Sequence, residues 1–271
     1  MYLPKIGIIG IIPVVLVVGL LSGSTAYSEE VFCFGLTIDQ LISSGDYTVF
    51  DNRDGSLGKK VTGTNGNDLI LGDDSKNTLN GKKGNDCIIG GSDKDKIKGG
   101  DGNDIIFGQN GNDDIKGDKG NDLIFGGDGD DKIKGGDGDD ILDLGPGKDS
   151  GSGDKGNDII LGRNGNDKLI GGDGDDILQG GDGKDKLSGR NGNDILSGGA
   201  GKDSLDAGRG DDILEGGEGD DKLKGSHGND ELVGGPGKNS LDGGRGDDLC
   251  RIDDNDKTKK CEEISTSDPR Y

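Results

Sequence analysis

The chain has 271 residues, and its composition excludes an ordinary globular core. Only 27% of the residues are hydrophobic and 3% are aromatic, while glycine contributes 59 residues and the formal net charge is -22. Low hydrophobicity with a high net charge predicts disorder unless something supplies the missing counter-charge. So acidic a chain repels nucleic acid phosphates and anionic lipids, so we expect no nucleic-acid partner and favour metal ions or a basic partner.

The first segment has the pattern of a secretory signal. Lys5 precedes an apolar run over residues 6–21, and small residues follow as far as Ala26. This order predicts a signal peptide over residues 1–28, cleaved near Ala26 or Ser28, and a secreted, extracellular protein with no stable membrane span after its removal. An uncleaved N-terminal membrane anchor is the alternative, although the run is short for a span and contains Pro13.

Residues 29–62 have the densest apolar content outside the leader, in "VFCFGLTIDQLI" and "DYTVFD". They precede a long repeat region, and residues 252–271 follow it. Because the terminal units of a repeat protein need covered ends, we expect residues 29–62 to be an N-terminal cap and residues 252–271 to be a C-terminal cap or tail.

Residues 63–251 repeat every nine residues without an insertion or deletion, which gives 21 repeats. Positions one and four are glycine, position six is aspartate and position eight is isoleucine or leucine, each in nearly every repeat. Glycines at positions one and four let the backbone visit positive φ, so we expect positions one to six to form a turn. The three remaining residues predict a short strand whose middle residue, at position eight, points into the core.

One aliphatic residue per nine cannot be buried by a single repeat. Two repeats per circuit, however, place two strand layers face to face with the position-eight side chains between them. The sequence therefore predicts an all-β fold, a parallel β-roll solenoid of about 21 nine-residue repeats with short capping segments. Leu144 at a turn-glycine position and Gly151 at a core position predict a local flaw in the middle of the roll.

The repeats "GGDGNDIIF" (99–107), "GGDGDDILD" (135–143) and "GGDGDDILQ" (171–179) resemble the nonapeptide of hemolysin-type, or repeats-in-toxin (RTX), calcium-binding proteins. This resemblance implies that multiple Ca2+ ions lie between consecutive turns on the same edge, held by position-six carboxylates and turn carbonyls. Oxygen ligands of this kind suit a hard cation that takes six to eight of them. The implied metal ligands are Asp68, Asp86, Asp95, Asp104, Asp113, Asp122, Asp131, Asp140, Asp149, Asp158, Asp167, Asp176, Asp185, Asp194, Asp203, Asp212, Asp221, Asp230 and Asp248. Sites are doubtful where Asn77 and Asn239 replace the aspartate and where Ser75 and Asp93 replace the turn glycine.

The four cysteines fall in two groups, at the two ends of the repeat region. In an exported protein the simplest pairing is Cys33 with Cys87 and Cys250 with Cys261, although spacing alone leaves the connectivity open. A zinc site is disfavoured because no two cysteines have C-x₂₋₄-C spacing and His227 is the only histidine.

The two outer faces of the predicted roll differ. Position seven is apolar in odd-numbered repeats and rich in lysine in even-numbered ones. We expect a protein partner or self-association through Ile105, Phe107, Leu123 and Phe125, with the strand-forming preference of isoleucine as the alternative reason for these residues. For the lysine-rich face, solubility and protection from stacking are favoured over binding of an anionic glycan.

The sequence contains no catalytic triad, no cleft with paired acids and no cofactor motif, so we predict that the protein is not an enzyme. The favoured function is calcium ion binding by an exported RTX β-roll that folds on binding Ca2+ and acts as a structural or interaction module. One alternative is a cell-surface adhesin or surface-layer component that docks through the apolar outer sheet. Another is an accessory module of a separate exported enzyme or toxin.

Overall fold

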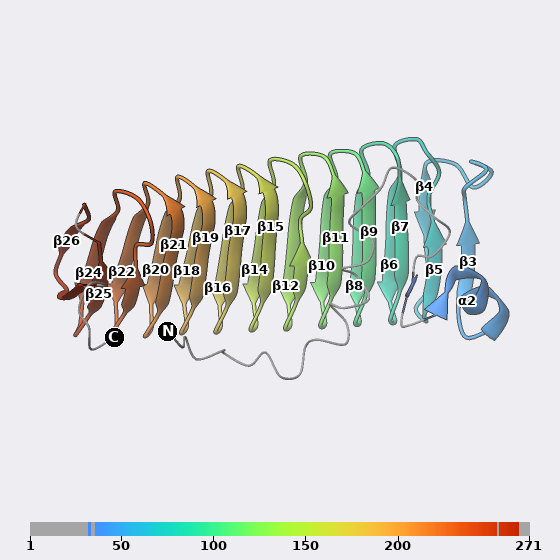
Figure 1. Ribbon diagram of the computed structural model, residues 1–271. Helices are drawn as coiled ribbons and strands as arrows, with labels where there is room; N and C mark the ends of the chain where they lie inside the picture. The colour runs from blue at the N-terminus through green and yellow to red at the C-terminus, as the bar shows by residue number, and fades with distance from the viewer. Residues whose placement is uncertain (1–31, 34–35, 254, 266–271) are drawn as a thin grey trace.

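The computed structural model describes residues 32–33, 36–253 and 255–265, which form an elongated parallel β-roll (Figure 1). The predicted all-β solenoid is therefore confirmed. The predicted signal peptide, residues 1–28, lies outside the described residues. Among the residues that the structure describes, no helix is long and apolar enough to cross a membrane.

Two parallel sheets form the two faces of the roll, and the chain passes from one to the other at every turn. The 13-stranded sheet contains β3 (Thr48–Asp51), β5 (Asp68–Leu71), β7 (Cys87–Gly91), β9 (Ile105–Asn110), β11 (Leu123–Asp128), β13 (Ile141–Asp143), β15 (Ile159–Gly165), β17 (Ile177–Gly183), β19 (Ile195–Gly201), β21 (Ile213–Gly219), β23 (Glu231–Val233), β25 (Leu249–Ile252) and β27 (Glu262–Ser265). The 12-stranded sheet contains β4 (Lys60–Thr62), β6 (Thr78–Lys83), β8 (Lys96–Asp101), β10 (Asp114–Lys119), β12 (Lys132–Asp137), β14 (Ser150–Lys155), β16 (Lys168–Asp173), β18 (Lys186–Asn191), β20 (Ser204–Arg209), β22 (Lys222–His227), β24 (Ser240–Arg245) and β26 (Lys257–Lys259).

The strand register shows that one circuit takes two repeats. Ile124 in β11 pairs with Ile106 in β9 and with Leu142 in β13, each 18 residues away. Since neighbouring parallel strands lie about 4.8 Å apart, each circuit adds about 4.8 Å to the length of the roll. Equivalent residues therefore form straight columns along it.

The core lies between the two sheets and consists of the position-eight side chains, as predicted. Ile106, Ile115 and Ile124 are 0% exposed, and the column of buried aliphatic residues continues in both directions along the roll. Full burial of one such side chain stabilises the folded state by about 1.5–3 kcal/mol. The apolar contribution is thus small for each circuit and is repeated many times.

At the predicted flaw in the middle of the roll, β13 is shortened to Ile141–Asp143, while in the core Leu144 and Gly151 compensate for one another. Leu144 is 0% exposed and belongs to the core cluster. A β-carbon added to Gly151 would lie 3.1 Å from both Leu144 methyl groups. The leucine at the turn position therefore fills the space that the missing core side chain leaves.

The expected roles of the turn glycines need one correction. Position four has positive φ as predicted, for example 141° at Gly102, but the other positive φ falls at position two, for example 127° at Gly100, and not at position one. Position one requires glycine for a different reason. A β-carbon on Gly99 would lie 2.9 Å from the Gly117 carbonyl oxygen and closer still to the carboxylate of Asp104.

The N-terminal cap begins with the antiparallel pair β1 (Phe32–Cys33) and β2 (Leu36–Thr37), followed by α2 (Ile38–Ser44). Thr37 caps this helix in a capping box with Gln40. The cap covers the outer face of β5 and β7, where Leu41 from α2 joins a cluster of buried apolar side chains. The buried members of this cluster are Cys33, Leu41, Leu69, Leu71, Cys87 and Ile89.

Both ends of the roll extend beyond the repeats. β3 and β4 add one circuit before Gly63, and β26 and β27 add one after Arg251. The Cys33–Cys87 and Cys250–Cys261 disulfides are both present, so the predicted pairing is confirmed, and the described residues contain no free cysteine. Each disulfide ties a non-repetitive end segment to the repeats.

Candidate metal centres

The position-six aspartates form two buried columns, one along each turn edge of the roll. Asp104, Asp122 and Asp140 lie on the edge formed by odd-numbered repeats, and Asp113 and Asp131 lie on the edge formed by even-numbered ones. All nineteen predicted ligands are between 0% and 5% exposed. The structure thus brings the predicted residues together in columns, while their role as ligands stays a prediction.

Each carboxylate along a column uses one oxygen to accept a hydrogen bond from the neighbouring circuit. The backbone N–H of Asp122 donates to Oδ1 of Asp140, and that of Asp140 donates to Oδ1 of Asp158, both at 2.8 Å. The same bond recurs at 18-residue intervals on both edges, for example between Asp113 and Oδ1 of Asp131 at 2.7 Å. These bonds fix the orientation of the carboxylate, and they leave its second oxygen, Oδ2, unused.

This second oxygen is buried and has no hydrogen-bond partner in eighteen of the nineteen predicted ligands. They are Asp86, Asp95, Asp104, Asp113, Asp122, Asp131, Asp140, Asp149, Asp158, Asp167, Asp176, Asp185, Asp194, Asp203, Asp212, Asp221, Asp230 and Asp248. A buried carboxylate without a counter-charge is strongly unfavourable, and native proteins pair such groups or bind metals with them. Two columns of uncompensated oxygens therefore indicate positions for cations.

The electrostatics of the columns lead to the same conclusion. Burial raises the pKa of Asp122 to about 7 and that of Asp140 to about 8, even though each accepts a backbone hydrogen bond that lowers it. The carboxylates of Asp122 and Asp158, one circuit away on either side, raise the pKa of Asp140 further. Without a cation the folded columns favour protonated carboxyls, whereas a bound cation would supply the charge that stabilises the ionised form.

Backbone carbonyl oxygens border the same space as the unused carboxylate oxygens. A β-carbon on Gly117 would collide with the Asp122 carboxylate and would lie 2.7 Å from the carbonyl oxygen of Gly135 in the next circuit. Because the glycine has no side chain, the space beside the carboxylate stays open. Calcium takes six to eight oxygen ligands, including carboxylates and backbone carbonyls, and these residues fit that chemistry.

The two asparagines at position six show which turn oxygens face this space. The side-chain amide of Asn239 donates to the carbonyl of Gly235 at 2.8 Å. That of Asn77 donates to the Asp73 carbonyl at 3.0 Å and also to the Ser75 carbonyl. In these two turns an N–H group contacts the carbonyls that a cation would contact elsewhere, which gives a physical reason for doubting sites at Asn77 and Asn239.

Asp68, the first predicted ligand, also differs from the rest. Its Oδ2 accepts from the backbone N–H of Thr64 at 2.6 Å, and its Oδ1 accepts from the Thr64 hydroxyl at 2.9 Å. Both oxygens therefore have partners within the same turn, and Asp68 has less need of a cation than the other eighteen.

The structure adds Asp256, which the repeat pattern missed. The backbone N–H of Asn239 donates to Oδ1 of Asp256 at 2.9 Å, so Asp256 continues the even column. The interval here is 17 residues instead of 18, and strict nine-residue counting therefore fails. The one available signal is local, since "NDKTK" (255–259) resembles "NDKLI" (166–170) in the repeats.

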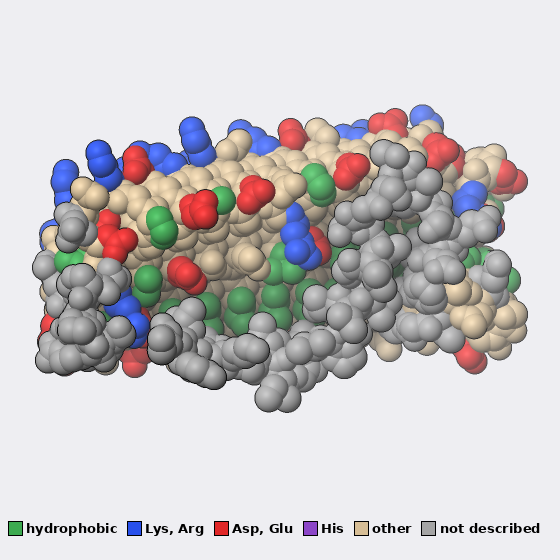
Figure 2. Space-filling view, viewed as in Figure 1, with side chains coloured by type: hydrophobic (Ala, Val, Ile, Leu, Met, Phe, Trp, Pro, Cys, Tyr) green, Lys and Arg blue, Asp and Glu red, His purple; other side chains and the backbone are tan. Residues whose placement is uncertain are grey.

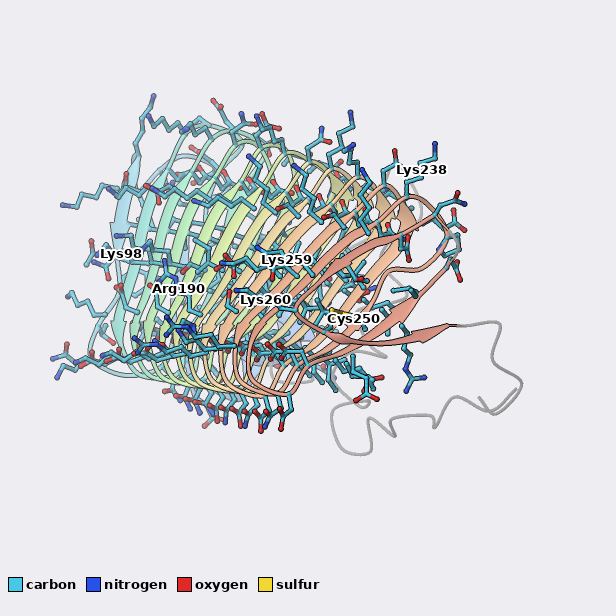
Figure 3. All side chains as sticks on the ribbon, turned by 90° about the vertical axis from the view of Figure 1, so that its left-hand side faces the viewer. Lys98, Arg190, Lys238, Cys250, Lys259 and Lys260 are labelled. Carbon is cyan, nitrogen blue, oxygen red and sulfur yellow. A yellow bond between two sulfur atoms is a disulfide. The ribbon has the colours of Figure 1, made fainter. Side chains whose placement is uncertain are left out.

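No group of three or more metal-ligating side chains occurs in the described part of the chain. The view along the roll shows both turn edges, where the backbone folds back between the sheets (Figure 3).

A parallel β-roll with columns of buried, uncompensated carboxylates at its turns defines a metal-binding solenoid. A profile described as "RTX calcium-binding nonapeptide repeat (4 copies)" matches residues 60–88, 89–124, 116–151, 152–187, 179–214, 188–223 and 215–250. The chain therefore belongs to the RTX calcium-binding nonapeptide repeat family, and the predicted resemblance is confirmed.

The fold is also similar to that of a solved protein from an Antarctic bacterium, described as a hyperactive, Ca2+-dependent, beta-helical antifreeze protein. The sequence identity is 19%, the match covers 90% of this chain and 85% of that chain, and the TM-score is 0.43. No curated protein matches the chain.

Proposed function

We propose that Ca2+ ions bind between successive turns on both edges of the roll, and that the protein folds as they bind. The observation that carries this proposal is the set of eighteen buried Oδ2 atoms without a partner. Asp140 and Asp158 occupy equivalent positions in successive circuits. A calcium ion between them would contact the Oδ2 atoms that otherwise lack a partner. Asp131 and Asp149 are related in the same way on the other edge.

The residues of the chain prepare these sites through geometry and charge. The backbone N–H groups hold each carboxylate in one orientation, and the position-one glycines keep the adjacent space open. Bound calcium would supply positive charge to two columns of like-charged groups. Because this arrangement is absent from the unfolded chain, the free energy of calcium binding becomes free energy of folding.

The family and the two disulfides support an extracellular protein, since disulfides persist in oxidising compartments. We propose that the chain is exported and serves there as a structural or interaction module without catalytic activity. In this role the chain forms a rigid rod only where calcium is abundant. The two outer faces of the rod are then available to partners.

The ligand assignment is tested by changing three columnar aspartates and comparing a matched control. Asp140→Asn, Asp158→Asn and Asp176→Asn keep the Oδ1 acceptor and remove the charge, as Asn239 does naturally. We expect this triple variant to need at least tenfold more calcium to fold, because it weakens three or four adjacent sites. The control, Asp137→Asn with Asp173→Asn, changes exposed carboxylates in β12 and β16. It should leave the calcium midpoint within a factor of two. Equal midpoints for the triple variant and the control would refute the assignment.

A second candidate role, surface adhesion, rests on the outer face of the 13-stranded sheet. Beyond the cap, apolar side chains continue along this face, visible as rows of hydrophobic residues in Figure 2. The Phe107 and Phe125 rings stack with their centroids 5.0 Å apart, and Ile177 and Ile213 are 38% and 39% exposed. A contiguous apolar surface of this kind is typical of a protein interface.

Sedimentation velocity in calcium tests this second role. Ile105→Ser, Phe107→Ser, Leu123→Ser and Phe125→Ser together should abolish any concentration-dependent association. Because Ile105 and Phe107 contact the cap cluster, Leu123→Ser with Phe125→Ser serves as a second variant that leaves the cap intact. If sedimentation is the same for the wild type and both variants at all concentrations, the apolar face has no role in association and the candidate fails.

A further inference from the structure

A line of exposed lysines runs along one long side of this acidic molecule. It combines positions five and seven of the even-numbered repeats, on the even turn edge and on the first residue of the strands of the 12-stranded sheet. We call it the lysine ridge: Lys76, Lys94, Lys96, Lys132, Lys148, Lys168, Lys184, Lys186, Lys202, Lys222 and Lys238, all of them exposed. Figure 2 shows Lys and Arg side chains, with acidic ones between some of them, along the upper edge of the roll, and Figure 3 labels Lys238.

Charge on this strip is opposite to that of the whole chain. The net charge is -22, whereas positions five and seven of the even repeats hold eleven lysines against three carboxylates, Asp114, Asp130 and Asp220. In the described part of the chain, none of the ridge lysines forms an ion pair. The ridge is therefore a strip in which lysines outnumber carboxylates, interrupted by Asp114, Asp130 and Asp220. Beside it lies the buried even column, where Lys94 and Lys202 favour the ionised forms of Asp113 and Asp221.

Other lysines on the same sheet are paired, which shows that the ridge is not a general property of this face. Lys98 contacts Asp118 at 3.6 Å, Lys134 contacts Asp154 at 3.5 Å, and Lys224 and Lys259 contact Asp206 and Asp242 at 3.2 and 2.9 Å. These paired lysines lie two residues further along the strands than the ridge. Ion pairs thus account for Lys98, Lys134 and Lys224 at position nine, although Lys116 at the same position forms none among the described residues, and they leave the ridge unexplained.

Some ridge lysines also face one another directly. Lys168 and Lys186 are register partners in β16 and β18. Like charges at directly opposed positions of a sheet destabilise it. An anionic ligand along the ridge would remove this repulsion.

The spacing of the ridge favours a linear ligand. At position seven, Lys96, Lys132 and Lys168 lie on every second strand of the sheet. With neighbouring strands about 4.8 Å apart, the ammonium groups recur about every 10 Å along a straight line. Double-stranded nucleic acid, with a negative charge about every 1.7 Å, would place most of its phosphates against the acidic remainder of the surface.

We propose that the lysine ridge binds a linear anionic polysaccharide whose sulfate or carboxylate groups lie along the axis of the roll. The roll supplies a straight template, and the ridge supplies regularly spaced cations. Charge complementarity carries the proposal. The ridge lies on the even turn edge, where its lysines flank the position-six aspartates, and it is separate from the odd turn edge and from the apolar face.

The test compares binding of dextran sulfate and of neutral dextran to the folded protein in calcium. Four ridge lysines, Lys132, Lys168, Lys186 and Lys222, are changed to serine, which occurs naturally at position seven at Ser150, Ser204 and Ser240. The matched control changes Lys98, Lys134, Lys224 and Lys259 to serine, and so removes the same charge from ion-paired positions of the same sheet. Circular dichroism and the calcium midpoint confirm that both variants fold.

Wild-type protein should bind dextran sulfate and not dextran, with an affinity that falls steeply as salt is raised, because polyanion binding releases counterions. The ridge variant should lose at least tenfold in affinity and show a shallower salt dependence, whereas the control should change less than threefold. Equal losses in the two variants, or no preference of the wild type for dextran sulfate, would overturn the proposal. Failure of calcium-dependent folding would instead appear in the dichroism spectra, before any polymer is added.

Discussion

At the scale of the residue, each of the four fixed positions of the repeat has one structural role. Aspartate at position six accepts a backbone N–H hydrogen bond with one oxygen and keeps the other buried without a partner, as Asp140 does. Glycine at position one gives the carboxylate room, and the aliphatic residue at position eight fills the core. Exceptions to the pattern therefore need a local compensation, and Leu144 with Gly151 provides the clearest case.

The first prediction concerns this pair. Leu144→Gly alone leaves a cavity in the core and should cost about 3–5 kcal/mol, in the range measured for large-to-small core substitutions. Gly151→Leu alone should cost about 1–3 kcal/mol because the space is already filled. The double variant restores the usual repeat and should be far more stable than the sum of the two losses. Urea unfolding in excess calcium measures all three variants, and additive losses would show that the two side chains do not compensate.

A second residue-scale prediction concerns position two. Gln109 has a φ of 77°, in the left-handed region that non-glycine residues adopt at a cost of about 1–2 kcal/mol. Gln109→Gly should therefore stabilise the folded protein by about 1 kcal/mol, after the greater flexibility of glycine in the unfolded chain offsets part of the gain. Urea unfolding in calcium provides the measurement. A loss of stability would mean that the glutamine side chain contributes contacts that outweigh its backbone strain.

At the scale of the element, one circuit is the unit of structure. The two ends of the roll are built differently. The N-terminal cap places α2 over the outer face of β5 and β7, and the Cys33–Cys87 disulfide joins β1 to β7. The C-terminal circuit is closed by β26 and β27, with Cys250 tied to Cys261. At both ends, therefore, a disulfide joins a non-repetitive segment to the roll, and only the N-terminal segment adds a helix.

Removal of the first disulfide should loosen the cap before the roll. The bond closes a loop of 54 residues, for which chain entropy predicts a stabilisation of about 4 kcal/mol. In the variant Cys33→Ser with Cys87→Ser, backbone amides of α2 and β3 should exchange hydrogen faster, while those of β17 and β19 should not change. Hydrogen exchange in calcium checks this, with Cys250→Ser and Cys261→Ser as the matched change at the other end. Uniform acceleration along the whole chain would contradict local fraying.

The repeat made most of the fold and of the candidate site predictable, because four positions of nine state their structural role directly. The repeat predicts that Ile106 lies in the core and that Asp104 ends a turn, and the structure places both residues there. Three features lay beyond the pattern. Leu144 filling the space beside Gly151 depends on a contact across the core, the position-one glycines depend on a neighbouring circuit, and Asp256 is displaced by one residue. All three depend on three-dimensional contacts, within a circuit for Leu144 and Gly151 and between circuits for the other two, which local sequence does not specify.

At the scale of the whole molecule, the protein is a rod whose core is small for each circuit and whose net charge opposes folding. Both carboxylate columns run the length of the repeats, and the net charge is -22. Ordering each residue costs about 1–2 kcal/mol of backbone entropy, against one well-buried aliphatic residue per nine. We therefore expect folding to depend on cations at the turns.

The pH dependence of the metal-free protein follows from the raised pKa values of the columns. Burial raises the pKa of Asp122 and Asp176 from 3.8 to about 7, so between about pH 4 and pH 7 the folded state holds protons that the unfolded chain has released. Raising the pH through this window therefore destabilises the metal-free fold. In chelator, circular dichroism should show more β structure at pH 5.5 than at pH 8.

Calcium should reverse this trend, because it competes with protons for the same oxygens. The calcium concentration at the folding midpoint should fall between pH 6 and pH 8. The Asp140→Asn, Asp158→Asn and Asp176→Asn variant is the control, and its metal-free form should depend less on pH than the wild type. A metal-free protein equally folded at pH 5.5 and pH 8 would show that the columns do not titrate as described.

The most direct test of calcium-coupled folding is a calcium titration followed by far-ultraviolet circular dichroism at pH 8. In excess chelator the chain should give the spectrum of a disordered polypeptide. Added calcium should convert it cooperatively to a β spectrum, and magnesium should substitute poorly because its strict octahedral shell suits these carbonyl-lined turns less well. A full β spectrum in chelator, unchanged when calcium is added, would contradict the account.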